Sequence, residues 1–317
     1  MTAHAKAALG IAVVIALALA ATGCGKQDDK VSDEQAQATQ AAFNQELQLW
    51  RQQRVAGLTK PDGWTSLVGL HWIEPGAHYI GSSAGNGIEL AVGPSHFGMI
   101  DLANGRLRFV PEKGVAMTLD GAPLTGETIL RADDAPAGPS VITFDEGKGI
   151  ATVIKRGPRY ALRVKHADAE TRTGFRGLEY WPASSDWRVT GRFVAHEPGK
   201  TLEIANIIGT TDAVPNPGAI EFEREGKTYR IEALDEGAET LFLVFADRTS
   251  GHGSYPAGRF LDVPKPGVGG TVLVDFNQSY NPPCAFTPFA TCPLPPPENR
   301  LDLLVQAGEK TYAHAAP

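Results

Sequence analysis

Short apolar or alternating runs of residues, each ended by a glycine-containing turn, dominate the chain from Trp64 onward. Asn104-Gly105 and Asp120-Gly121 are typical of tight hairpin turns, because both turn positions favour positive φ. Turns that recur roughly every ten residues predict a β-sandwich or a barrel. A content of 35 glycines and 23 prolines favours an all-β chain over an α/β chain. The clearest runs occupy residues 87–92, 105–110, 115–119 and 149–154.

A second series of strand-like runs follows a boundary that we place near residue 170. Glu225-Gly226 lies between two of these runs in the manner of a hairpin turn. The runs 241–246 and 271–276 are continuously apolar, which predicts buried central strands, and the run 301–306 is expected to close the sheet. The expected strands occupy residues 187–194, 219–224, 227–232, 241–246, 271–276 and 301–306.

A single helix is expected at residues 36–60, after a polar and charged tether at residues 24–35. Gly57 and Pro61 are signals that end it. Apolar residues at helical spacing give the helix one face for packing on the following domain. These residues are Phe43, Leu47 and Trp50.

The fold that we predict is therefore mainly β. An N-terminal helix precedes two connected β-sandwich or barrel-like units, at residues 61–170 and 171–317. The sequence leaves open whether the two units share one core.

The N-terminus resembles the signal peptide of a bacterial lipoprotein. Lys6 supplies the positive charge, and residues 7–21 form an apolar run that is too short for a comfortable membrane span. Residues 21–24, Ala-Thr-Gly-Cys, resemble a lipobox, which implies cleavage before Cys24 and attachment of a diacylglycerol to its thiol. Gly25 at the next position favours transfer to the outer membrane in a Gram-negative cell. An ordinary secretory signal and an uncut anchor helix are the alternatives, and each also places the body outside the cytoplasm.

The charge of the chain argues against several classes of partner. Removal of residues 1–23 takes away one lysine and no acid, so the formal net charge changes from −7 to −8. An acidic body gives no reason to expect nucleic acid or anionic lipid as a partner. Phosphate-loop, zinc-protease and dinucleotide-binding motifs are absent from the sequence. We expect no cofactor and no metal site.

A segment near the C-terminus has an unusual composition. Seven prolines fall between Asn281 and Glu298, a density that neither a helix nor a buried strand tolerates. The segment is therefore an ordered loop, a place where functional residues tend to lie. We call residues 281–298 the Cys/Pro loop, because it also contains Cys284 and Cys292.

These two cysteines have seven residues between them. Outside the cytoplasm such a pair most simply forms a disulfide, which would constrain the unfolded chain by about 2–3 kcal/mol. A zinc site is one alternative, although its paired ligands usually lie closer and His252 is the only obvious further ligand. Two free thiols are the other alternative.

Polar residues cluster at the ends of the expected buried strands around this loop. If these strands are neighbours, the side chains converge at one edge of the sheet and form a pocket. Asp247 with His252 would supply a base and the group that orients it, Arg259 and Arg300 would bind an anionic group, and the carboxylates, Asp262 included, would hold a hard cation. In the alternative structural role, these residues satisfy backbone groups of the loops. The candidate ligand-binding residues are Asp247, His252, Tyr255, Arg259, Asp275, Asn277, Tyr280, Asn281, Glu298, Asn299 and Arg300.

Several phrases of the sequence together resemble DUF1684, an uncharacterised bacterial and archaeal family. The phrases are residues 62–72, 245–251, 255–262 and, above all, 275–301. The resemblance covers about residues 45–312. It implies one domain type and shared motif positions, and it implies no activity, substrate or cofactor.

A weaker resemblance links residues 65–130 to forkhead-associated domains, which read phosphothreonine. The phrase 79–81 and the pair Asp120-Gly121 have the arrangement of that β-sandwich. However, Ser82 occupies the place of the phosphate-binding arginine, and Asp120 replaces an asparagine. Without the cation a phosphate would lose its charge-assisted contact, so only the scaffold is expected to be shared.

The sequence thus predicts a lipid-anchored protein of the cell envelope that binds a small molecule or an envelope component at the Cys/Pro loop. An envelope hydrolase that uses aspartate and histidine residues of the same region is one alternative. A structural lipoprotein without a ligand pocket is another.

Replacement of Cys24 removes the thiol that lipid modification requires. We expect Cys24→Ala to release the protein from membranes or to block its processing. Membrane fractionation followed by immunoblotting checks this prediction. Unchanged membrane association of the variant would rule out the lipobox interpretation.

Overall fold

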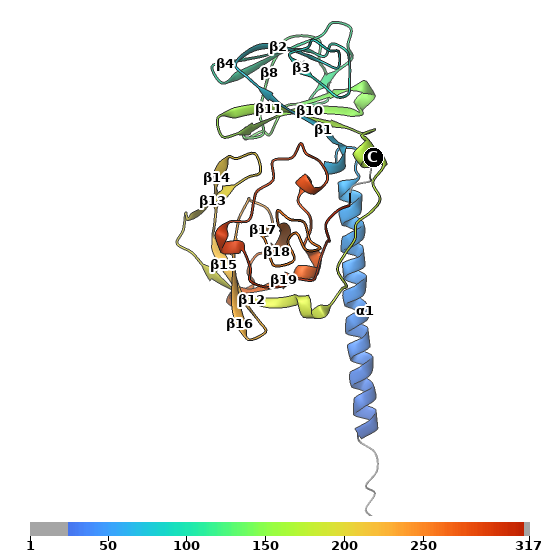
Figure 1. The fold of residues 1–317 in the computed structure, drawn as a ribbon, viewed down its shortest axis with the longest axis vertical. Helices are drawn as coiled ribbons and strands as arrows, with labels where there is room; N and C mark the ends of the chain where they lie inside the picture. The colour runs from blue at the N-terminus through green and yellow to red at the C-terminus, as the bar shows by residue number, and fades with distance from the viewer. Residues whose placement is uncertain (1–24, 314–317) are drawn as a thin grey trace, which may run out of the picture. The chain divides into compact units, whose positions relative to one another are not determined.

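The computed structural model describes residues 25–313, with side chains from residue 35 onward (Figure 1). Cys24 and the expected signal peptide lie outside the described residues. The chain divides into two compact units, residues 1–43 and residues 44–317.

Helix α1 spans Gly25–Leu58. It begins earlier than residue 36, where we expected it, and so includes most of the segment that we interpreted as a tether. The sequence between Lys26 and Ala56 contains neither proline nor glycine, so nothing in it interrupts a helix. Leu47 and Leu58 are buried, with 2% and 1% of their surface exposed. Within the described residues, no helix combines the length and the hydropathy needed to span a membrane.

Two sheets build a β-sandwich from residues 67 to 166. The first sheet has the order β1 (Leu67–Ile73), β11 (Arg159–His166), β10 (Gly149–Arg156), β9 (Val141–Phe144), β6 (Thr118–Leu119) and β7 (Ala122–Pro123). The second has the order β3 (Ile88–Glu89), β2 (Gly76–Gly81), β4 (Gly98–Ala103), β5 (Arg106–Pro111) and β8 (Thr128–Leu130). One core joins the two sheets, and in it the Phe97 ring lies 5.6 Å from that of Phe109 and 5.1 Å from that of Phe144.

The remaining strands form three smaller sheets after a short helix, α2 (Glu170–Thr173). The four-stranded sheet has the order β16 (Lys227–Ala233), β15 (Gly218–Arg224), β12 (Arg188–Ala195) and β19 (Thr271–Asp275). The two hairpin-like pairs are β13 (Thr201–Ala205) with β14 (Thr211–Pro215), and β17 (Thr240–Phe245) with β18 (Arg259–Pro264). Phe276 lies at the centre of their core, with its ring 5.4 Å from Phe222 and 5.6 Å from Phe245.

The prediction of a mainly β fold with an N-terminal helix is confirmed, and so are three hairpin turns. The pairs Asn104-Gly105, Asp120-Gly121 and Glu225-Gly226 all have positive φ and connect β4 to β5, β6 to β7 and β15 to β16. The Asp120 carboxylate also accepts hydrogen bonds from the Val141 amide and from Arg131.

Three strand predictions are wrong in their topology. The runs 241–246 and 271–276 are largely buried, but β17 pairs in a two-stranded sheet and β19 is the last strand of its sheet. The run 301–306 forms no strand. Alternate residues from Leu301 to Ala307 are buried, as in a strand. Leu301 and Leu303 bond the backbone of the segment that follows β17, whereas charged side chains bond the backbone of Val305 and Ala307.

Arg259 and Asp247 form a buried ion pair whose two side chains make hydrogen bonds to the backbone of this segment. The guanidinium is fully buried, and its Nη2 donates to Asp247 Oδ2 at 2.8 Å and to the Val305 carbonyl at 2.9 Å. Its Nη1 donates to the Ala307 carbonyl. The other carboxylate oxygen, Oδ1, accepts from the amides of Thr249 and Val305 at 2.7 and 3.2 Å. Two charged side chains therefore hold Val305 and Ala307, beyond the point where backbone bonds of Leu301 and Leu303 hold the segment.

Removal of the arginine leaves a carboxylate buried without its cation. We expect Arg259→Met to lower the free energy of unfolding by about 3–5 kcal/mol, the usual cost of breaking a buried ion pair from one side. Urea denaturation measures this loss. Arg248→Met is the matched control. Arg248 follows Asp247 in the sequence and pairs with Asp302 at the exposed surface. Its replacement is therefore expected to lower the free energy of unfolding by less than about 1 kcal/mol. Equal destabilisation by the two substitutions would refute the role of the pair.

Candidate functional site

A pocket of about 450 Å³ opens where three parts of the unit 44–317 meet. The parts are the C-terminal turns of α1, the strand pair β17–β18, and the first residues of the Cys/Pro loop. The lining residues are Trp50, Gln53, Arg54, Leu58, Trp64, Glu236, Phe242, Phe260, Asp262, Tyr280 and Pro283.

Aromatic rings form much of the wall of this pocket. The Phe242 and Phe260 rings meet edge to face with centroids 4.9 Å apart, and Phe260 meets Tyr280 in the same way at 5.8 Å. Trp50 and Trp64 add two indoles. Alternate residues of a strand point to the same face of the sheet, so Phe260 and Asp262 lie on one face of β18. Asp262 is the register partner of Phe242 on β17. An apolar wall and a carboxylate therefore share one sheet face.

Two carboxylates lie at the pocket. The Tyr280 hydroxyl donates to Asp262 Oδ2 at 2.8 Å. Both residues are exposed at the surface, and partial burial of their carboxyl groups by the pocket walls raises the pKa of Asp262 and of Glu236. The charge of Asp262 raises the pKa of Glu236 further, while the hydrogen bond from Tyr280 and the charge of Arg54 oppose the rise in pKa at Asp262. The pocket thus holds two carboxylates whose charged forms are under-stabilised.

Arg54 is the cation that lines the pocket, and its charge is already matched. Its Nε donates to Glu309 Oε1 at 2.8 Å, and its Nη2 donates to the Asn281 carbonyl at 2.8 Å. The Glu309 side chain is fully buried, and its second oxygen accepts from the Asn281 amide at 2.7 Å. The guanidinium also lies 4.6 Å from the centroid of the Tyr280 ring. Arg54 therefore joins helix α1 to the start of the Cys/Pro loop.

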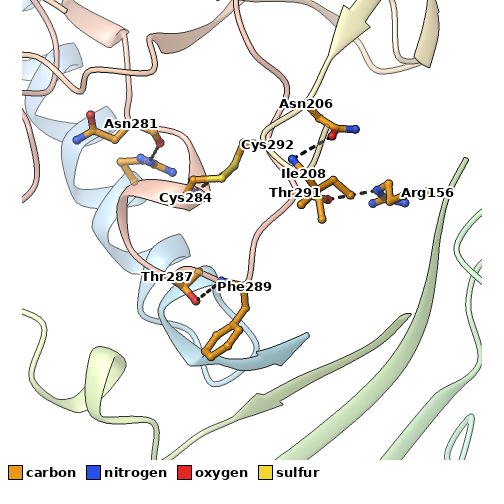
Figure 2. Close-up of a disulfide and its surroundings, with 10 residues drawn as sticks. Arg156, Asn206, Ile208, Asn281, Cys284, Thr287, Phe289, Thr291 and Cys292 are labelled. Carbon is orange, nitrogen blue, oxygen red and sulfur yellow. Dashed lines mark hydrogen bonds between the residues drawn. A yellow bond between two sulfur atoms is a disulfide. The ribbon is translucent and has the colours of Figure 1, made fainter. Parts of the chain in front are cut away.

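The expected disulfide is present in this loop. Figure 2 shows Cys284 bonded to Cys292, with Cα atoms 6.2 Å apart. Further along, the Phe289 amide donates to Thr287 Oγ1 at 3.3 Å, and Thr291 accepts from Arg156 of strand β10 at 3.2 Å. These contacts order the segment between the two cysteines.

The returning half of the loop packs closely on the turn before β18. A Cβ at Gly258 would lie 2.5 Å from Pro295 Cγ and 2.6 Å from the Phe245 carbonyl, at a φ of +97°. Only glycine fits this position without strain. The proline run therefore lies directly against the strand pair that carries the pocket.

The structure separates the candidate residues predicted from the sequence. Tyr280 lines the pocket, and Asn281 supports it through Arg54 and Glu309. Asp247 and Arg259 form the buried pair of the core. Asp275 instead accepts from Arg188 at 2.7 Å and from Asn277 at 2.8 Å. These last residues hold strands and turns together and do not reach the pocket.

The other predicted residues also lie away from the pocket lining. The Asn299 amide group is buried and bonds the backbone of Glu232 and of Val244. Tyr255 packs against an apolar cluster around Phe286. Three residues are exposed at the surface: His252, Glu298 and Arg300.

The geometry does not assemble the catalytic or metal-binding arrangements considered from the sequence. Asp247 bonds Arg259 and two amides, whereas the ring of His252 is exposed with Nδ1 3.3 Å from the Ser250 carbonyl. Across the described residues, no group of three or more histidine, cysteine, aspartate or glutamate side chains is placed to hold a metal ion.

Most residues that line the pocket escaped the sequence analysis. The sequence predicts Trp50 only as a residue of the packing face of the helix. Trp64 stands only within residues 62–72, which resemble DUF1684. Phe242 and Phe260 lie in apolar runs that suggested nothing beyond a core. One sequence signal could have indicated the pocket: Asp262 is a charged residue within the apolar run of β18, two positions after Phe260.

Comparison with known proteins places the chain in a family. Residues 173–310 match the model of DUF1684, whose members are described as proteins of unknown function. The chain belongs to the DUF1684 family. The matched region is shorter than the 45–312 that the sequence phrases suggested. It contains the pocket residues from Glu236 to Pro283, whereas those of α1 and Trp64 precede it.

Solved structures similar to part of the chain include the following one. It is the solution NMR structure of an uncharacterized protein of Haloarcula marismortui, with 30% sequence identity and a TM-score of 0.37. The similarity covers 44% of this chain and 79% of that chain. Among curated proteins, none matches the chain.

Opening of the disulfide frees the loop in the unfolded chain. We expect the double variant Cys284→Ser/Cys292→Ser to lose about 2–3 kcal/mol of unfolding free energy, the value for closing a loop of this length. Urea denaturation with and without dithiothreitol measures it. Dithiothreitol should lower the stability of the native chain to that of the variant and leave the variant unchanged. A native chain that is insensitive to the reductant and labels fully with iodoacetamide before unfolding would disprove the disulfide.

Proposed function

We propose that this protein is a lipid-anchored component of the cell envelope that binds a small organic molecule in the pocket beside the Cys/Pro loop. One observation carries the binding proposal: five aromatic residues and a few polar groups line a cavity of about 450 Å³. Ligand sites of proteins are typically apolar clefts of roughly 300–1,000 Å³ with a small number of placed polar groups.

The parts that form the pocket are held in place from several sides. Arg54 ties the helix to the loop through Glu309 and Asn281. The disulfide closes the loop shortly after Pro283. A pocket whose walls are fixed in this way binds a ligand without a large entropic cost of ordering its own side chains and loops.

Attachment to the membrane rests on the sequence alone. The lipobox-like residues 21–24 support a lipid at Cys24, and the body would then face the periplasm, at the outer membrane in a Gram-negative cell. A ligand from the envelope, free or part of a larger component, would be available there.

A substitution that fills the pocket tests its role as a binding site. Gln53 is exposed and lines the pocket, so Gln53→Trp obstructs it without removing a buried contact. A metabolite library is screened by thermal shift, because a ligand at 100 times its Kd adds about 2.7 kcal/mol to the stability of the native state. We expect hits that stabilise the native chain to lose their effect on Gln53→Trp.

Gln52→Trp is the matched control for this screen. Gln52 is also exposed, lies next to Gln53 on α1 and does not line the pocket. Hits should stabilise this variant as they do the native chain. Hits that stabilise Gln53→Trp undiminished would place the binding site elsewhere.

A further inference from the structure

The charges around the pocket are out of balance. Arg54 and Glu309 neutralise each other at 2.8 Å. Asp262 has the Tyr280 hydroxyl as its hydrogen-bond partner, and in the described part of the chain neither Asp262 nor Glu236 lies within ion-pair distance of a cationic side chain. Two carboxylates therefore remain at the pocket without an ion-pair partner, although the more distant charge of Arg54 acts on Asp262.

The aromatic walls, like the two carboxylates, favour a ligand with a positive charge. The face of an indole, phenol or phenyl ring carries negative electrostatic potential, so it attracts cations. Trp64 already has Arg163 and Lys165 within 5.4 and 5.3 Å of its ring centroid, although neither of them lines the pocket. Rings that attract cations thus surround two unmatched carboxylates.

We propose that the ligand of this pocket carries a compact organic ammonium group, which sits between the carboxylates of Glu236 and Asp262 and against the aromatic rings. This inference rests on the proposed function and names the chemical class that the site takes. Primary amines and quaternary ammonium groups both belong to that class.

Other ligand chemistries fit the same residues less well. An anion would meet two carboxylates, and two of the Arg54 nitrogens already donate to Glu309 and to the Asn281 carbonyl. A neutral sugar would stack on the rings but leave the two charges unmatched. Partial burial raises the pKa of both carboxyl groups, and a bound cation would offset this cost directly.

The test compares a cation with its neutral isostere. Choline and 3,3-dimethylbutan-1-ol have nearly the same shape, and only choline is charged. Isothermal titration calorimetry at constant ionic strength should give choline or ethanolamine at least a tenfold lower Kd than the neutral alcohol. Glycerophosphoethanolamine, titrated in parallel, distinguishes a lipid headgroup from a free amine as the source of the ammonium group.

Substitutions that remove only the charges complete the test. Glu236→Gln and Asp262→Asn should each raise the Kd of the ammonium compound about tenfold. Glu236 is exposed on the turn before β17, so its variant is expected to fold even where Asp262→Asn does not. Asp212→Asn, an exposed residue of β14 that does not line the pocket, is the control and should leave the Kd unchanged.

The outcomes separate the ligand class from the pocket itself. Equal binding of choline and the neutral alcohol, or no measurable binding of either amine, overturns the ammonium proposal. Neutral or anionic compounds whose stabilisation disappears on Gln53→Trp would still support the binding site. If the amines do not bind and no compound of the library is sensitive to Gln53→Trp, the proposed binding function is refuted as well.

Discussion

The buried ion pair of Arg259 and Asp247 is the interaction on which the C-terminal half of the fold depends. A fully buried guanidinium is costly unless its donors are paired, and here its two terminal nitrogens bond the carboxylate and the carbonyls of Val305 and Ala307. The same pair fixes the register of β18, since Arg259 begins that strand. Phe260 and Asp262 follow on the opposite face, so the charge that faces the core also sets the position of the residues that face the pocket.

One strand carries side chains of both the core and the pocket. Along β18, Arg259 and Leu261 face the core while Phe260 and Asp262 face the pocket. The helix and the loop then complete the wall through the contacts of Arg54. None of the three parts forms the site alone, because each supplies only a few of its side chains.

The local patterns of the sequence predicted the class of the fold and little of the site. Hairpin turns such as Asn104-Gly105 were predictable because positive φ is a property of two adjacent residues. The disulfide followed from composition and compartment. The role of Asp247 and Arg259 was not predictable, since the carbonyls that Arg259 bonds and the Val305 amide that Asp247 bonds lie more than forty residues away in the sequence. For the same reason Trp50, Trp64 and Glu236 gave no sign that they meet around a common space.

The proline content of the Cys/Pro loop has a consequence for the energetics of recognition. Each proline fixes φ, so a segment with seven of them has few conformations to lose on folding. Packing of Pro295 against Gly258 leaves little room for the returning half to move. If the proposed site binds a ligand, little of its free energy would be spent on ordering this loop.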